Sequence, residues 1–151
     1  MINDRLRAYC PKCKDWVRRE GIHECQIKQF ILIDEIMTGV ADRLYAMEID
    51  CTMVMWSVYE VGKGNGIFRY NLSIDLHDDL YVEFLGDLPF GWHYFRFEGD
   101  KISSLEFSDI TLWDSYDEAR AMVDVSVSEF ERFLDSRDAD GVRAVMRLLG
   151  G

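Results

Sequence analysis

Residues 56–74 read WSVYEVGKGNGIFRYNLSI, two runs rich in strand-forming residues on either side of a glycine-rich break. The break, Gly62 to Gly66, has glycine at three of its five positions, and glycine supplies the positive φ that a hairpin loop needs. The pattern predicts a β-hairpin with strands over 56–61 and 67–74. Such a hairpin in the middle of the chain favours a fold built on an antiparallel sheet.

Further strands are predicted on both sides of this hairpin. Apolar and polar residues alternate from residue 45 to residue 55, with a break expected near Thr52. The expected buried set is Tyr45, Met47, Ile49, Cys51, Met53 and Met55. Shorter runs predict strands at 29–34, 80–85, 92–98 and 102–107, with turns at 76–79, 86–91 and 99–101. The strands together predict an antiparallel meander.

The C-terminal third changes to a helical pattern. Ser115 and Ser128 each precede a glutamate by three residues, which is the capping-box spacing of a helix start. Two starts predict two helices with a break over 123–127, and a last helix over 140–149 ends at Gly150. The apolar faces of these helices are expected to cover the sheet. The predicted fold class is therefore α+β, an N-terminal zinc knuckle followed by a meander under C-terminal helices.

The N-terminal segment carries a metal-ligand motif. Cys10-Pro-Lys-Cys13 is followed after nine residues by His23-Glu-Cys25, so three thiols and one imidazole lie within sixteen residues. These are the number and types of ligand that a structural, tetrahedral zinc ion requires. With all four positions filled by protein, the ion would have no open site for catalysis. We therefore expect Zn²⁺ bound by Cys10, Cys13, His23 and Cys25.

This motif resembles the short, ribosomal-type zinc ribbons in which a Cys-Pro-x-Cys knuckle is followed by a His-x-Cys pair. The resemblance covers about a tenth of the chain and implies a structural zinc ion. In that family the residue after the second cysteine is commonly glycine, whereas this chain has Lys14. Trp16 lies beside the motif, and we expect it to pack as a cover for the small knuckle more readily than to stack on a nucleic-acid base.

Charge divides the chain near residue 28. Residues 1–28 hold seven Lys or Arg and four Asp or Glu, whereas residues 29–151 hold ten against 24, a net charge of −14. We therefore expect two domains, a zinc knuckle over 1–28 and an acidic α+β domain over 29–151. An acidic body repels nucleic-acid phosphates and attracts basic proteins. Nucleic acid would then bind only through the knuckle's basic residues, Lys12, Lys14, Arg18 and Arg19.

The chain offers weak evidence for an enzyme. Asp75, His77, Asp78 and Asp79 form a cluster that could hold a divalent metal for phosphodiester hydrolysis, although an acidic turn is the simpler interpretation. A Gly-x-Ser-x-Gly motif is absent from the sequence, and Cys51 lies on the apolar phase of a strand. The sequence therefore favours a protein without catalytic activity.

Three functional hypotheses follow. The first is a regulator or inhibitor whose acidic surface docks on a basic protein, such as a nucleic-acid-binding one. The alternatives are a nucleic-acid-binding regulator acting through the knuckle and a metal-dependent hydrolase at residues 75–79. The expected contact residues of the first are Asp78, Asp79, Asp87, Trp92, Tyr94, Trp113, Asp114 and Asp117. The acidity could instead serve solubility alone. Without a long apolar run, the chain is expected to be cytoplasmic and not membrane-bound.

Overall fold

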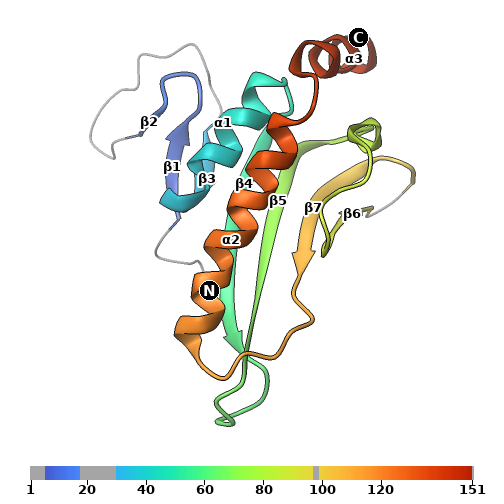
Figure 1. Cartoon of the computed structure of the whole chain (residues 1–151). Helices are drawn as coiled ribbons and strands as arrows, with labels where there is room; N and C mark the ends of the chain where they lie inside the picture. The colour runs from blue at the N-terminus through green and yellow to red at the C-terminus, as the bar shows by residue number, and fades with distance from the viewer. Residues whose placement is uncertain (1–5, 18–29, 97–98, 151) are drawn as a thin grey trace.

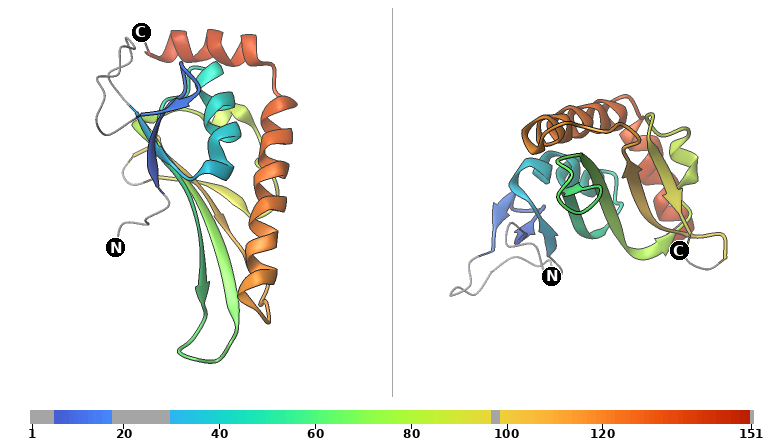
Figure 2. Two further views of the ribbon diagram at one scale, coloured as in Figure 1. Left: turned by 90° about the vertical axis from the view of Figure 1, so that its left-hand side faces the viewer. Right: turned by 90° about the horizontal axis from the view of Figure 1, so that it is seen from below.

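The computed structural model describes residues 6–17, 30–96 and 99–150, with the side chain of Asp79 left out. Its strands are β1 (Arg7–Cys10), β2 (Asp15–Trp16), β3 (Ile31–Ile33), β4 (Cys51–Glu60), β5 (Phe68–Leu80), β6 (Trp92–Phe95) and β7 (Ile102–Ser108). Its helices are η1 (Glu35–Met37), α1 (Thr38–Ala46), η2 (Glu83–Leu85), α2 (Tyr116–Asp135) and α3 (Ala139–Gly150). The strands form one sheet with α1 and α2 on one face, which confirms the α+β class (Figure 1 and Figure 2).

The sheet has the order β2-β1-β3-β4-β5-β7-β6, which is not a meander. β3 and β4 are parallel neighbours, and β5 pairs with β7 while β6 lies at the edge. Parallel neighbours need a crossover connection, and α1 provides it here. The expected boundary near residue 28 does not separate two sheets, because β1 pairs with β3. None of the helices in the described part of the chain has the length and apolar character needed to cross a bilayer.

The segment around residues 38–55 differs from its prediction. Residues 38–46 form α1, which buries Val40, Ala41 and Leu44, so Tyr45 lies in a helix and not in a strand. β4 begins at Cys51 and continues through Thr52, where a break was expected; its register with β5 shifts there, between Cys51 and Met53. An extra residue moves every later side chain to the other face. Val54 and Trp56 are therefore buried, whereas Met53 and Met55 are only half-buried on the opposite face.

β5 runs without interruption through the residues that were expected to form a turn at 76–79. Asp75 still pairs with Met53 of β4, and Leu80 still pairs with Ile102 of β7. Leu76 is buried in the core cluster, which gives this polar stretch a hydrophobic attachment to the sheet. The predicted strand at 80–85 is also wrong, because the chain leaves the sheet after Leu80 and forms η2.

Only one of the two predicted capping boxes begins a helix. Ser115 Oγ accepts a hydrogen bond from the Glu118 backbone N–H at 3.1 Å, as expected for the first residue before a helix. Ser128 lies exposed in the middle of α2, which continues unbroken from Tyr116 to Asp135. The apolar face also continues past the expected break, through Val123 and Val127. α3 begins and ends within one residue of its predicted bounds.

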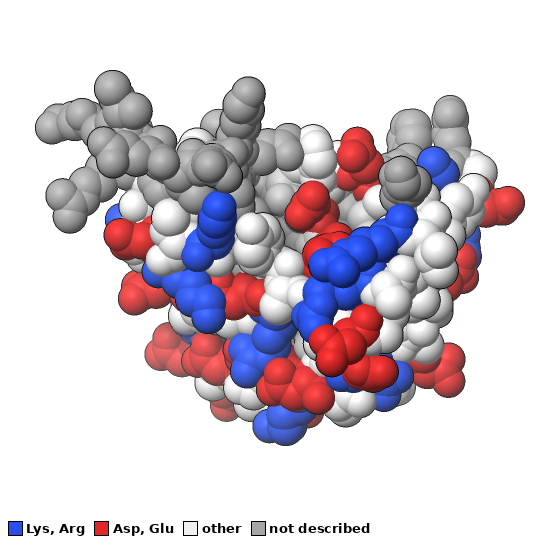
Figure 3. All heavy atoms as spheres, turned by 90° about the horizontal axis from the view of Figure 1, so that it is seen from above, with Lys and Arg blue, Asp and Glu red and all other residues white. Residues whose placement is uncertain are grey.

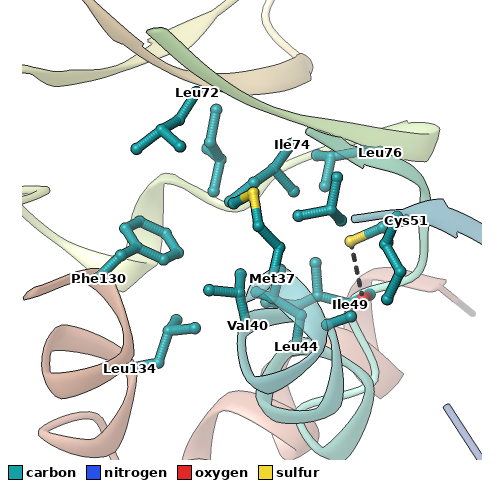
Figure 4. Close-up of a cluster of buried hydrophobic side chains, with 14 of the residues drawn as sticks. Met37, Val40, Leu44, Ile49, Cys51, Leu72, Ile74, Leu76, Phe130 and Leu134 are labelled. Carbon is teal, nitrogen blue, oxygen red and sulfur yellow. Dashed lines mark hydrogen bonds between the residues drawn. The ribbon is translucent and has the colours of Figure 1, made fainter. Parts of the chain in front are cut away.

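The core lies between the sheet and the two covering helices. Met37, Val40 and Leu44 reach from η1 and α1, Phe130 and Leu134 from α2, and all five meet apolar side chains of β4 and β5 (Figure 4). Cys51 is buried there with its thiol directed at the Ile49 carbonyl oxygen, 3.7 Å away. Burial raises the pKa of the Cys51 thiol, which keeps it neutral and unreactive.

The two serines give a direct test of the helix start. Ser115→Ala is expected to lower the free energy of unfolding by about 1 kcal/mol, because the Glu118 N–H loses its acceptor. Ser128→Ala is the matched control and should leave stability unchanged or raise it slightly, since alanine favours a helix interior. Urea unfolding of the two variants measures both effects. Equal losses would mean that Ser115 does not act as a cap.

Candidate functional site

The N-terminal knuckle is built on the β1–β2 hairpin. Cys10 is the last residue of β1 and is fully buried, and Cys13 lies exposed in the turn that follows. The Cys13 backbone N–H donates a hydrogen bond to Cys10 Sγ at 3.5 Å. His23 and Cys25, the other two expected ligands, lie outside the described residues. Within the described ranges no three His, Cys, Asp or Glu side chains come together as a metal group.

Lys14 has a backbone φ of +54°, in the left-handed region that favours glycine. This is the position at which the zinc ribbons that the motif resembles commonly carry glycine. Lys14 thus has a left-handed backbone conformation although it is not a glycine. Lys14 and Lys12 are both exposed, while Arg18 and Arg19 lie outside the described residues.

Trp16 packs within the hairpin instead of presenting an open ring. Its ring meets Tyr9 edge-on at 5.3 Å, and the Arg7 guanidinium lies 4.4 Å from its centroid. Tyr9 is itself anchored to α1, because its hydroxyl donates to Asp42 Oδ1 at 2.7 Å. These contacts support a packing role for Trp16, since an aromatic platform for a base needs an uncovered face.

The residues of the expected hydrolase site do not converge. Asp75, His77 and Asp78 follow one another along β5, where alternate side chains point to opposite faces of the sheet. Asp75 accepts a hydrogen bond from Ser73 Oγ at 3.0 Å, and His77 Nε2 lies 3.9 Å from Asp78 Oδ2. The described side chains of this cluster thus show no arrangement suited to a two-metal reaction.

The three aromatic residues expected to anchor a partner have roles inside the fold. Trp92 is only 8% exposed and packs on Phe107 and Phe130, so it does not offer a surface anchor. Tyr94 is half-buried and its hydroxyl donates to the Gly86 carbonyl at 2.6 Å; burial raises its pKa to about 12. Trp113 is half-buried, with Nε1 donating to Asp109 Oδ2 at 2.6 Å.

The acidic residues expected to contact a partner lie in separate regions. Asp114 and Asp117 lie at the start of α2, while Asp87 follows η2, whose Leu85 carbonyl accepts a hydrogen bond from Arg137 just beyond the other end of α2. A helix of this length spans roughly 30 Å. Asp78 is exposed near the end of β5. One partner surface therefore cannot be inferred from these acids together.

Arginines offset part of the acidic charge. At the end of the molecule where α3 lies, basic and acidic side chains are interleaved (Figure 3). Arg147 pairs there with Glu48, and Arg143 pairs with Asp140. Arg43 of α1 similarly joins Glu131 and Asp135 of α2, each at 2.8 Å. The acidity of this region is thus less available to a partner than the net charge suggests.

The outer edge of β6 is a surface that the sequence analysis missed. Among the described strands only β7 pairs with β6, so its other edge is open. The Ser108 N–H donates to the Gly91 carbonyl at 3.1 Å, which sets the alternation of backbone groups along the pair. By that alternation the Tyr94 N–H and C=O and the Trp92 C=O point away from the sheet.

Exposed aromatic side chains flank this edge. Phe90, 86% exposed, lies in the turn before β6, and Phe95, 44% exposed, is its last residue. His93 is also exposed. We call the open backbone edge of β6 together with Phe90, His93 and Phe95 the β6 edge surface. Phe90 lies between proline and glycine in a turn, a context in which an apolar side chain has few neighbours, and this signal could have been found in the sequence.

Neither a protein-family model, nor a curated protein, nor a solved structure matches this chain, so its function is inferred from its own geometry.

Proposed function

We propose that this protein is a non-enzymatic interaction protein that binds an extended, basic segment of a partner protein along the β6 edge surface. The observation that carries the proposal is an aromatic strand, Trp92–Phe95, whose outer edge is unpaired in the described structure. The role would be that of a regulator or inhibitor, because the basic segment of the partner could not contact another molecule while it is bound here.

The backbone of β6 supplies the main attraction. An open strand edge presents N–H and C=O groups that pair readily with another extended chain, and natural proteins protect such an edge with a very short strand or with lysine or proline. β6 itself, Trp-His-Tyr-Phe, contains neither. Phe90 and Phe95 would give the complex apolar anchors, since aromatic side chains contribute a large share of binding energy at interfaces.

Charge favours a basic partner. Residues 29–151 carry a net charge of −14, and Asp87 is exposed in the segment that leads to β6, whereas Glu83 in that segment is paired with Arg96. Opposite charges raise the rate of encounter, and salt screens this gain. The same net charge repels the phosphates of free nucleic acid.

The test is selection of random displayed peptides on the full-length protein. We expect the selected peptides to be rich in Lys and Arg and in β-branched residues, and to associate more slowly at high salt than at low salt. Phe95→Lys should weaken their binding about tenfold or more, because it removes an anchor and adds a repelling charge.

Ile110→Lys is the matched control. Ile110 is 72% exposed and lies beyond the end of β7, so this variant makes the same change of charge and polarity elsewhere. Its effect on binding should be small. Peptides that bind wild type and Phe95→Lys equally well, or a selection that enriches acidic peptides, would contradict the proposal.

We also propose that one structural zinc ion holds the N-terminal knuckle. The support is the fit of the turn: the Cys13 N–H donates to Cys10 Sγ, and Lys14 adopts the glycine-like conformation next to Cys13. Cys10, Cys13, His23 and Cys25 would bind the ion, and its chemistry would be structural only. The ion would fix the hairpin whose β1 strand extends the sheet at β3.

A further inference from the structure

A pocket of about 520 Å³ lies toward the β2 edge of the sheet, away from β6. Its wall combines two arginines and two tryptophans from four different elements: Arg7 of β1, Trp16 of β2, Trp56 of β4 and Arg120 of α2. Tyr116, the first residue of α2, and Glu35 of η1 also line the pocket. The volume falls within the range of pockets that hold small organic ligands.

Each arginine stacks on one tryptophan. The Arg7 guanidinium carbon lies 4.4 Å from the Trp16 ring centroid, and the Arg120 guanidinium carbon lies 4.4 Å from the Trp56 ring centroid. A guanidinium group held over an aromatic ring still has N–H groups that can donate to another partner. The tryptophans therefore hold two sets of donors in place inside one pocket.

These donors are only partly used. Arg7 makes no hydrogen bond or ion pair with any residue in the described ranges, and Arg120 uses Nη1 for Asp124, 3.0 Å away. Asp34 also lines the pocket, but its Oδ1 accepts the Ile36 N–H at 3.1 Å and caps η1. Glu35 is exposed and forms no ion pair with either arginine in that same part of the chain. The positive groups thus remain available to a ligand.

We propose that this pocket binds an organic phosphate of mononucleotide size. Two guanidinium groups suit a phosphate because their planar forks form paired, charge-assisted hydrogen bonds to its oxygens. A bare phosphate would leave most of the volume empty, whereas a ring attached to it can pack against Tyr116 and the outer face of a stacked guanidinium.

This site is independent of the proposed partner surface. It draws on β1, β2, η1, β4 and the first turns of α2, while the β6 edge surface lies at the opposite edge of the sheet. Substitutions in one are therefore expected to leave the other intact, and the two proposals fail or succeed separately.

Calorimetric titration of the full-length protein with adenosine monophosphate, adenosine and inorganic phosphate tests the proposal. The nucleotide should bind at least about tenfold more tightly than either of its parts, since the phosphate and the ring contact different walls. Arg7→Gln and Arg120→Gln should each weaken nucleotide binding by about 10- to 100-fold. Glu35→Gln should strengthen binding severalfold, because it removes a like charge from the mouth of the pocket.

Arg132→Gln is the matched control, because Arg132 is exposed on the same helix and does not line the pocket. It should bind the nucleotide as wild type does. Thermal melting followed by circular dichroism shows whether each variant is folded. Because the two pocket arginines come from different elements, the second variant still tests the proposal if the first does not fold. The proposal is overturned if none of the three probes binds, if phosphate alone binds as tightly as the nucleotide, or if Arg132→Gln weakens binding as much as Arg120→Gln.

Discussion

Serine in place of both Cys10 and Cys13 is expected to abolish zinc binding and to lower the metal content of the purified protein from about one equivalent to none. The effect is large because a structural zinc ion needs all four ligands, and its apparent binding free energy in small zinc domains is about 10–16 kcal/mol at neutral pH. Without the ion, the β1–β2 hairpin is expected to open and the emission of Trp16 to shift to the red, since that ring is packed on Tyr9.

Elemental analysis of the protein measures the metal, and Cys51→Ala is the matched control. Cys51 is buried in the core and its thiol stays neutral, so its removal should leave the zinc content unchanged. Lowering the pH should also release the ion, because thiolate and imidazole ligands must be deprotonated to bind it. A double serine variant that keeps its full metal content would refute the ligand assignment.

Truncation of Phe130 to alanine is expected to lower the free energy of unfolding by about 3–5 kcal/mol. Phe130 has no exposed surface, and its ring lies 4.2 Å from Trp92 and 5.7 Å from Phe133, measured between ring centroids. Its removal leaves a cavity between α2 and the sheet that the surrounding side chains fill only in part. The loss is a large share of a total stability that is typically about 5–15 kcal/mol.

Urea unfolding measures this loss, with Phe90→Ala as the control. Phe90 is almost fully exposed, so its truncation should change stability by less than about 0.5 kcal/mol. If Phe130→Ala does not fold, Phe130→Leu keeps most of the volume and should cost less, with the same sign. Equal stabilities for the alanine variants of Phe130 and Phe90 would show that the α2 face does not form the core.

The correct predictions of secondary structure came from features whose physics is local. The hairpin loop at residues 62–66 needs glycine φ values, and Glu60, the last residue of β4, accepts hydrogen bonds from the N–H groups of Gly64 and Gly66. The cap at Ser115 likewise involves only atoms three residues apart. Such interactions involve only residues close together in the chain, so a short pattern can predict them.

The wrong predictions concern segments whose local pattern fits two structures. Ser128 and Glu131 have capping spacing, yet α2 continues through them because Val123, Val127 and Phe130 bury one continuous face against the sheet. The polar stretch at 76–79 has the composition of a turn, but it stays in β5, because β5 pairs with β4 before this stretch and Leu80 pairs with Ile102 of β7 after it. Tertiary packing outweighs weak local preference in both cases.

For the functional sites the same division holds. The acidic charge of residues 29–151 and the α+β class could be inferred from the order of residues, because composition and short spacing express them directly. The zinc site at the N-terminal cysteines stays a prediction. The open edge of β6 and the pocket of stacked arginines could not be inferred in this way. Both depend on which strands become neighbours: β6 is an edge because β7 takes the place beside β5, and Arg120 meets Trp56 because α2 crosses β4. Contacts between residues far apart in the chain form only when the whole core assembles, and no short segment carries their signal.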